Sequence, residues 1–504
     1  MELAEDAPEF FTDLNLHQIV DSITAGREEY NLKPFFYTPV HDLDTVNYRY
    51  EVLRDLDNQD LLANIRSFAR EMQVMRALLA QADKAYYKPS KRSWFLDAAQ
   101  VYCTAVMRLR DDLVTAELDS SGFLAFREYL LSYTASAAFA SLVAETEKLK
   151  ADLSSITYSL YIEGKRITVS RYDSAPDYSA DVIETFEKFK QDAPREYRFD
   201  FPDGPDMDHV EAAILDRVAL LYPDIFTSLD EYYARHRAYV DSTLAAFDRE
   251  VQFYVACIEH VDRFKTAGLP FCRPAVTSES KEVYGRDVFD LALAGRLVSE
   301  RAAVVTNDFH LRDPERIIVV SGPNQGGKTT FARTFGQLHY LASLGCPVPG
   351  SEARLFLCDK LFTHFEREED IRNLSGKLED DLLRIHRILE QATPDSILIM
   401  NESFLSTTLS DALFLSKEVL ERVIERDMLC VSVTFLDELA SLAETTVSMV
   451  STVDPRDPAL RTFKIVRRPA DGLAYAAAIA EKYGLTYGRV KTRIGAKTRR
   501  DGAS

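Results

Sequence analysis

The sequence IIVVSGPNQGGKTT, residues 317–330, joins a β-branched apolar run to a glycine-rich loop, a lysine and two threonines. Glycines let the backbone curl so that successive N–H groups face one phosphate, and a helix N-terminus favours negative charge there. At this spacing Lys328 is expected to contact the β and γ phosphate oxygens, and the Thr329 hydroxyl is expected to hold Mg²⁺. The segment therefore predicts a phosphate-binding loop, of which Gly322, Gly326, Gly327 and Thr330 are further members.

The residues on either side of this loop support the prediction. Residues 317–320 have the composition of a buried strand. After the loop, apolar residues recur at helical spacing until Gly345 and Pro347, which predict the end of a helix. A merely glycine-rich turn is the alternative, but a strand before the loop and a helix after it favour phosphate binding.

A second buried strand is predicted at SILIM, residues 396–400, and it ends in Asn401 and Glu402. A carboxylate at the end of a strand beside a phosphate-binding loop can polarise a water molecule that attacks the phosphate. Glu402 is therefore the candidate general base, and Lys328 is the second candidate catalytic residue. The alternative for Glu402 is an exposed acid at a strand end.

The composition restricts the class of protein. The chain has 504 residues, which predicts more than one domain, and its formal net charge of −20 argues against indiscriminate nucleic-acid binding. Six scattered cysteines form no C-x-x-C pair, so reduced thiols are expected. The acidic N-terminus lacks the pattern of a signal peptide, and no apolar stretch reaches transmembrane length. These features predict a cytoplasmic protein without membrane contact.

The first part of the chain is helical and charged. Residues 61–79 carry one apolar stripe at helical spacing, which is typical of core packing. The β-branched and aromatic residues around Glu163 and Gly164 predict a hairpin near residues 157–172 between long helices. After residue 270 strands and helices alternate, which predicts a parallel sheet covered by helices.

The C-terminal two hundred residues resemble the ATPase domain of the MutS mismatch-repair proteins. The resemblance rests on a Pro-Asn pair, Pro323 and Asn324, after the first glycine of the loop, and on a Gly-Gly-Lys before the hydroxyls. Upstream, Asn307 matches a segment that lies along the nucleotide in that family. Downstream, Ser375 within NLSGKLEDDL resembles the ABC-type signature, which in relatives faces the nucleotide of the other subunit.

The resemblance implies a multidomain α+β protein, with a mostly helical core and lever region followed by an α/β ABC-type ATPase domain. The expected domains are an acidic N-terminal extension at 1–34, the helical region at 35–270, the ATPase domain at 271–488 and a basic tail at 489–504. With a lever-like segment from about residue 35, the chain resembles a short form without the mismatch-recognition and connector domains. ATP, Mg²⁺ and a homodimer are the implied ligands and assembly.

Three departures from the family pattern bear on activity. Asn401 stands where the family has an aspartate, so that the expected Mg²⁺ site, Thr329 and Asn401, loses a charge. Phe435 stands where the family has a histidine near the γ-phosphate, and Val304 where many relatives stack an aromatic ring on adenine. Together these departures predict slow ATP hydrolysis.

Two functions remain open from the sequence. The first is a dimeric ATPase clamp that acts on DNA in mismatch repair or recombination and contacts phosphates through Lys165, Arg166 and Arg171 of the hairpin. The second is a nucleotide-gated switch whose partners are proteins or ribonucleoprotein. The acidity of the chain and the residues at 401 and 435 favour the second, whereas the lever-like region and the basic hairpin favour the first.

Overall fold

A computed structural model describes residues 3–172, 209–366, 376–457 and 460–470, together with 487 and 491. The chain divides into two compact units, one formed by Met1–Leu53 with Val251–Ser504 and the other by Arg54–Glu250. Their division points fall within helices α4, Leu43–Asp55, and α12, Ser242–Thr266. The compact units therefore do not coincide with the domain limits expected after residues 34 and 270. The tail at 489–504 lies outside the described residues, apart from 491.

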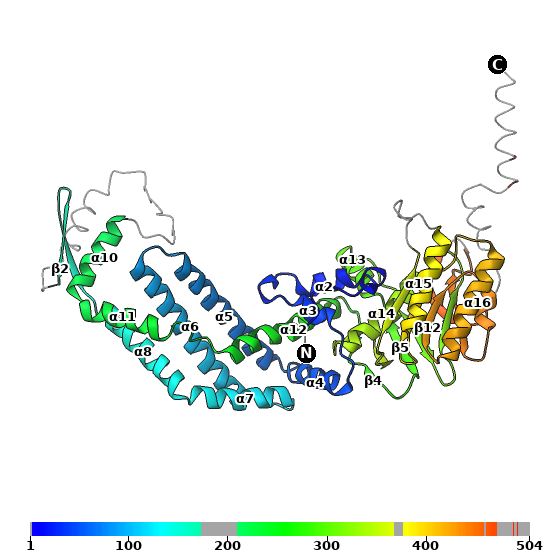
Figure 1. Cartoon of the computed structure of the whole chain (residues 1–504), viewed down its shortest axis with the longest axis horizontal. Helices are drawn as coiled ribbons and strands as arrows, with labels where there is room; N and C mark the ends of the chain where they lie inside the picture. The colour runs from blue at the N-terminus through cyan, green and yellow to red at the C-terminus, as the bar shows by residue number, and fades with distance from the viewer. Residues whose placement is uncertain are drawn as a thin grey trace, which may run out of the picture. The chain divides into compact units, whose positions relative to one another are not determined.

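The described residues of the unit Arg54–Glu250 are helical apart from one hairpin (Figure 1). Helix α5 carries the predicted apolar stripe, and the Asn58 side chain caps it by accepting hydrogen bonds from the N–H groups of Asp60 and Leu61. Leu61, Ile65 and other stripe residues are buried, as predicted. No helix in the described part of the chain is long and apolar enough to cross a membrane. The helices that lie wholly within the described residues of this unit are α5 Gln59–Lys84, α6 Lys88–Thr115, α7 Ser121–Thr134, α8 Ala137–Ser154, α10 His209–Leu221 and α11 Pro223–Arg235.

The predicted hairpin is present. Strands β1, Tyr158–Glu163, and β2, Arg166–Arg171, pair antiparallel, with Glu163 opposite Arg166. Gly164 adopts a φ of 62° in the two-residue turn, a backbone conformation that glycine tolerates better than other residues. The connection expected at residues 173–208 lies outside the described residues.

The larger unit is built on a six-stranded sheet in the order β10-β11-β12-β7-β13-β14. The first five strands are parallel, as predicted, and β14 is antiparallel to β13. The strands are β7 Ile317–Ser321, β10 Leu361–Phe365, β11 Ile397–Asn401, β12 Leu429–Val433, β13 Thr446–Val453 and β14 Arg461–Arg467. The helices that follow β7, β10 and β11 are α14 Lys328–Ser343, α15 Lys377–Gln391 and α16 Leu409–Glu425, and the 3-10 turn η3 is Asp437–Ser441.

Alternation along β7 explains why helices cover both faces of this sheet. Ile318 and Val320 belong to one buried cluster with Phe331 and Phe335 of α14. Ile317 and Val319 belong to another cluster with residues of α15 and α16. Because successive strand residues point to opposite faces, a strand apolar at every position requires cover on both sides. This arrangement fixes the carboxyl end of β7, and with it the loop that precedes α14.

A second sheet, in the order β4-β9-β5-β6, was not predicted. Its strands are β4 Ala275–Thr277, β5 Val283–Val288, β6 Asn307–Leu311 and β9 Glu352–Phe356, and a short pair is formed by β3 Phe271–Cys272 and β8 Val348–Pro349. Strand β5 is antiparallel to both neighbours, so the expectation of parallel strands alone was wrong for this part of the chain. Helix α13, Leu291–Ser299, connects β5 to β6.

The N-terminal residues form part of the core of this unit. They fold into α1 Phe10–Asp13, α2 Leu16–Thr24, η1 Glu28–Tyr30 and α3 Lys33–Tyr37, which Figure 1 draws in dark blue beside α13 and α14. Phe11 is fully buried with its ring centroid 5.2 Å from that of Tyr340. Gln337 Nε2 donates a hydrogen bond of 2.9 Å to the Leu14 carbonyl. The segment expected to be an acidic extension therefore packs against α14, because its apolar residues fill a face that the helix leaves open.

Candidate functional site

The loop at residues 322–327 joins β7 to α14 and packs closely against β13. Gly322 has a φ of 112°, and a Cβ atom there would lie 2.9 Å from the Ser451 carbonyl oxygen. A Cβ atom on Gly326 would lie 2.1 Å from Ser451 Oγ, which donates a hydrogen bond of 2.7 Å to the Gly326 carbonyl. Glycine is therefore required by space at Gly326 and by backbone conformation at Gly322. The last loop residue, Gly327, precedes α14 with a φ of 90°.

Lys328 is the first residue of α14 and its side chain returns over the loop. Its Nζ donates to the Gly322 carbonyl at 2.9 Å, and the Pro323 carbonyl and Asn324 Oδ1 both lie at 3.3 Å. Only 4% of Lys328 is exposed, and this burial lowers its pKa below the usual value for lysine. The nearby Glu402 carboxylate has a smaller effect, which raises the pKa. A buried ammonium ringed by oxygen dipoles at a helix N-terminus can bind an anion that enters the loop.

Thr329 and Asn401 meet at the ends of α14 and β11. The Thr329 hydroxyl donates a hydrogen bond of 2.8 Å to Asn401 Oδ1. Oxygen atoms of this kind are ligands for Mg²⁺, but both residues are neutral. No group of three or more His, Cys, Asp or Glu side chains among the described residues could hold a metal ion. The pair therefore fits an ion that takes most of its remaining ligands from water and phosphate.

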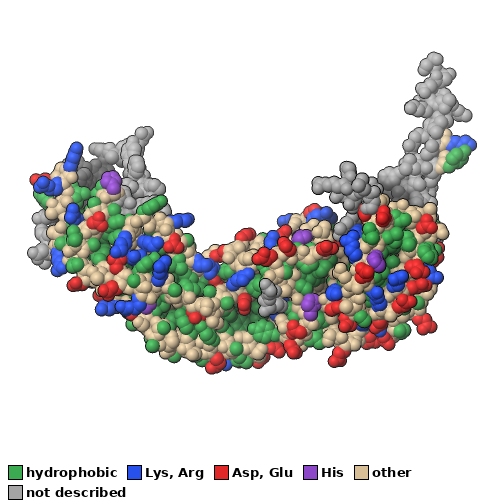
Figure 2. Space-filling view, in the orientation of Figure 1, with side chains coloured by type: hydrophobic (Ala, Val, Ile, Leu, Met, Phe, Trp, Pro, Cys, Tyr) green, Lys and Arg blue, Asp and Glu red, His purple; other side chains and the backbone are tan. Residues whose placement is uncertain are grey.

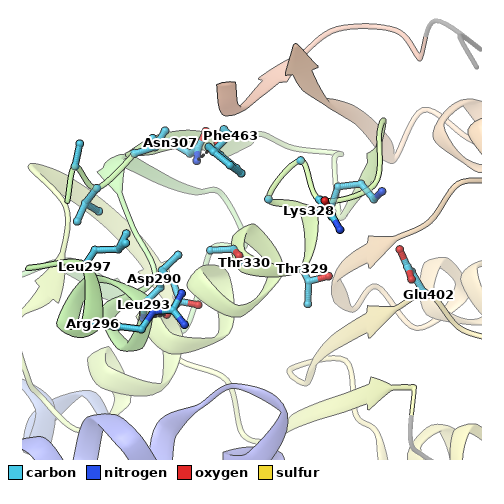
Figure 3. A pocket seen from close by; sticks show the side chains of 16 residues that line it. Asp290, Leu293, Arg296, Leu297, Asn307, Lys328, Thr329, Thr330, Glu402 and Phe463 are labelled. Carbon is cyan, nitrogen blue, oxygen red and sulfur yellow. Dashed lines mark hydrogen bonds between the residues drawn. The ribbon is translucent and has the colours of Figure 1, made fainter. Parts of the chain in front are cut away.

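Glu402 follows β11 and lies near Lys328 and Thr329. Its backbone N–H donates a hydrogen bond of 2.9 Å to the Val433 carbonyl of the neighbouring strand β12. The backbone φ angle of Glu402 is 51°. This left-handed conformation is rare for a residue with a side chain and is common at functional sites. In Figure 3 the Glu402 carboxylate lies beyond Thr329, at the end of the loop away from Asn307.

A cavity of about 500 Å³ opens beside the loop. Lys328, Thr329, Thr330 and Glu402 line one part of it, and Asn307 with Phe463 lines another (Figure 3). The other lining residues are Asp290, Leu293, Arg296, Leu297, Ala303, Val304, Val305, Gln325, Gly326 and Gly327. Volumes of this size are ordinary for small-molecule sites. The structure thus brings together the predicted loop, the predicted general base and Asn307, which are far apart in the sequence.

Val304 and Phe435, which depart from the family pattern, lie in different places relative to the cavity. Val304 lines the cavity. Phe435 follows β12, is 47% exposed and is not among the lining residues. Ser375 lies outside the described residues, and Gly376 beside it precedes α15.

The sequence did not predict a buried histidine behind Glu402. His364 of β10 is fully buried, with Nδ1 2.8 Å from Ser403 Oγ and Nε2 3.2 Å from the Asp381 carbonyl of α15. Because a carbonyl only accepts, Nε2 carries the proton and the Ser403 hydroxyl donates to Nδ1. His364 therefore connects α15 to the residue next to Glu402. The sequence signal was a polar residue within the apolar run LFTHF, residues 361–365.

The hairpin residues proposed to contact phosphates differ from one another. Lys165 and Arg166 are exposed at the turn. The Arg171 guanidinium instead donates hydrogen bonds to the Leu221 carbonyl at the end of α10 and lies over the Tyr222 ring, 5.0 Å from its centroid. Arg171 therefore anchors the hairpin to α10.

The fold and the cavity define an α/β domain with a candidate anion-binding loop between β7 and α14. Residues 318–486 match the family model of MutS domain V. This part of the chain belongs to the MutS family, as the motifs predict.

Curated relatives agree with this assignment. The chain is 29% identical over 223 residues to the DNA mismatch repair protein MutS of Orientia tsutsugamushi strain Boryong, covering 43% of this chain and 24% of the relative. It is 23% identical over 294 residues to the MutS protein of Ruminiclostridium cellulolyticum, covering 56% of this chain and 32% of the relative. It is 30% identical over 141 residues to the MutS protein of Caldicellulosiruptor saccharolyticus, which covers 28% of this chain and 16% of the relative. The chain thus spans at most a third of the length of these relatives.

The contact between Ser403 and His364 generates a stability prediction. Replacing Ser403 by alanine leaves the buried Nδ1 of His364 without its donor, which should cost about 1–3 kcal/mol of unfolding free energy. Ser406→Ala in the same loop is the control, because Ser406 is exposed and should change stability by about 0.5 kcal/mol or less. Urea denaturation measures both. Equal stability of the two variants would show that the His364 contact does not hold this loop.

Proposed function

We propose that this chain binds and hydrolyses ATP in the cavity beside α14 and uses the nucleotide to control binding to DNA, as a MutS-superfamily protein in mismatch repair or related DNA processing. The observation that carries the proposal is the convergence of Lys328, Thr329 and Glu402 on one cavity within a MutS domain V. Proteins named DNA mismatch repair protein MutS are its matched relatives. ATP and Mg²⁺ are part of this proposal.

The triphosphate would lie on the loop at the start of α14. Backbone N–H groups of the loop and of the first helical turn are available to an anion there, and the helix dipole favours negative charge. Lys328 would exchange its contacts with the loop carbonyls for phosphate oxygens, which hold an ammonium more strongly because they are charged. This exchange offsets the cost of burying the ammonium.

Thr329 and Asn401 would hold Mg²⁺, which when bound places positive charge beside the phosphate oxygens. An aspartate at position 401 would add a negative charge that asparagine lacks, so the ion should be held less strongly than in relatives that carry aspartate. Glu402 would accept a proton from the attacking water, since its carboxylate lies at the same cavity. With Asn401 and Phe435 in place of the family residues, slow turnover is the expected outcome.

Contact with DNA would be made through the exposed part of the hairpin. Lys165 and Arg166 remain candidates for phosphate contacts, whereas Arg171 is occupied by α10. Such contacts position a protein on DNA without reading its sequence. A homodimer that closes when ATP is bound, with Ser375 completing the site of the partner, is the mechanism that the MutS resemblance suggests.

A second candidate function is a nucleotide-gated switch that binds proteins or ribonucleoprotein. In Figure 2 many Lys and Arg side chains lie on the visible face of Arg54–Glu250. Several basic residues of this unit are paired with acids of the same unit: Lys88 and Arg92 both contact Asp230, and Lys150 contacts Asp97. Paired charges attract DNA phosphates less strongly, and this observation favours the second function.

Lys328→Ala and Glu402→Gln separate nucleotide binding from hydrolysis. Lys328→Ala should abolish ATP binding, because it removes the buried ammonium from the centre of the loop. Glu402→Gln should retain ATP binding and lower kcat about 100-fold or more, as expected for loss of a general base. Calorimetry measures binding and phosphate release measures kcat. Lys417→Ala, at an exposed position of α16, is the control. An unchanged hydrolysis rate in Glu402→Gln would remove Glu402 as the base.

The two candidate functions are separated by fluorescence anisotropy with homoduplex, mismatched and branched DNA, with and without ATP, over a range of salt concentrations. A DNA-directed clamp should bind at physiological salt and respond to ATP. Because each phosphate contact contributes about 0.9 to the slope of log K against log salt, Lys165→Glu with Arg166→Glu should reduce that slope by about 2.

Lys148→Glu is the matched control for charge, since Lys148 is exposed on α8 of the same unit. A slope unchanged by the hairpin substitutions would exclude the hairpin as a DNA contact. Absence of binding to every DNA, with ATP still bound, would favour the second function.

A further inference from the structure

The loop that follows β11 carries backbone strain on both sides of Ser403. Glu402 has a φ of 51° and Phe404 a φ of 63°, and both angles lie in the left-handed region that residues with a side chain rarely adopt. Such a conformation is unfavourable by itself and persists only where the surrounding structure holds it. The contacts of the loop Glu402–Phe404 therefore decide where the Glu402 carboxylate lies.

Two contacts hold the ends of this loop. The Glu402 N–H donates a hydrogen bond of 2.9 Å to the Val433 carbonyl of β12. Phe404 is fully buried and belongs to the apolar cluster that contains Met400 and Leu436. Ser403 lies between these fixed points, so a third contact there defines the path of the backbone from one to the other.

His364 supplies this third contact from the neighbouring strand β10. Its Nδ1 accepts the hydrogen bond of 2.8 Å from Ser403 Oγ, and its ring centroid lies 5.9 Å from that of Phe404. In the parallel pairing of β10 with β11, His364 is opposite Met400, two residues before Glu402. The histidine thus lies against both residues that follow the candidate base.

Helix α15 holds the ring of His364 in one orientation. The ring is fully buried, and its Nε2 donates a hydrogen bond of 3.2 Å to the Asp381 carbonyl of α15. Arg384 of the same helix donates a hydrogen bond of 3.1 Å to the Phe365 carbonyl, next to His364 in the sequence. Because Nε2 carries the proton, Nδ1 is free to act as the acceptor for Ser403.

We propose that His364 is a positioning residue for Glu402, because it holds the strained loop through Ser403 and so keeps the Glu402 carboxylate at the cavity. This inference rests on the proposed hydrolysis of ATP. His364 and Ser403 are not among the residues that line the cavity. The contact should therefore affect kcat and leave the affinity for ATP unchanged, since a displacement of about 1 Å can slow a reaction about 100-fold.

The test measures kcat by phosphate release and the Kd for ATP by calorimetry. Ser403→Ala should lower kcat about 10- to 100-fold and leave the Kd within about twofold. Ser403→Thr keeps the hydroxyl and should retain most of the original kcat. Because both residues act through one contact, His364→Gln combined with Ser403→Ala should lower kcat no further than either change alone.

Two amide replacements of His364 separate a hydrogen-bonding role from a packing role. The side-chain oxygen of asparagine can take the place of Nδ1, whereas the amide of glutamine can take the place of Nε2. His364→Asn should therefore keep an acceptor for Ser403 and retain most of the original kcat. His364→Gln loses that acceptor and should lower kcat as Ser403→Ala does.

Ser396→Ala is the matched control for lost stability. Ser396 is a buried serine whose Oγ donates a hydrogen bond of 2.9 Å to Asp359 Oδ1. It directly precedes β11, at the end of the strand away from Glu402. Both serine-to-alanine variants should unfold at lower urea concentration than the original protein, but kcat should fall only in Ser403→Ala.

A kcat of Ser403→Ala equal to that of Ser396→Ala would overturn the positioning role, as would equal kcat values for His364→Asn and His364→Gln. In both cases ATP hydrolysis by the original protein would still support the proposed function. Absence of hydrolysis by the original protein would overturn the proposed function and this inference with it.

Discussion

The burial of the Lys328 ammonium at the start of α14 is the interaction on which the site depends. A charge removed from water is costly unless oxygen atoms surround it, and the loop supplies them from Gly322, Pro323 and Asn324. The loop can adopt this shape only because Gly326 lets Ser451 of β13 approach closely. The geometry of the loop is thus a product of sheet packing, and the sheet is held by apolar residues on both of its faces.

The remaining parts of the site are positioned by the same sheet. Glu402 follows β11, two strands away from β7, and His364 of β10 secures its neighbour Ser403. On the opposite side, β14 carries Phe463 and is clamped by Asn307 of the second sheet. One cavity therefore gathers a cation, a carboxylate and an aromatic ring from Lys328, Glu402 and Phe463, which are spread over more than a hundred residues of the sequence. Lys328, Glu402 and Phe463 all lie in the part of the chain that matches MutS domain V.

The sequence predicted those elements whose residues form a pattern within one short segment. The β7–loop–α14 unit, the strand before Glu402 and the hairpin turn at Gly164 were all readable from composition and spacing. The second sheet was not, because its strands are short and pair across long sequence separations. The packing of Phe11 and Leu14 on α14 was hidden by the acidic residues around them, although their apolar spacing was present. Nothing local marks Phe463 as a residue of the cavity, and it lies where the pairing of β14 with β13 shifts register.

A crystal structure with Mg²⁺ and a non-hydrolysable ATP analogue tests the proposed site most directly. We expect the triphosphate on the N–H groups of residues 322–329 with Lys328 in contact, and the metal ion beside Thr329 and Asn401. A nucleotide bound elsewhere, or phosphates in this loop with Lys328 still on the Gly322 carbonyl, would contradict the proposed site.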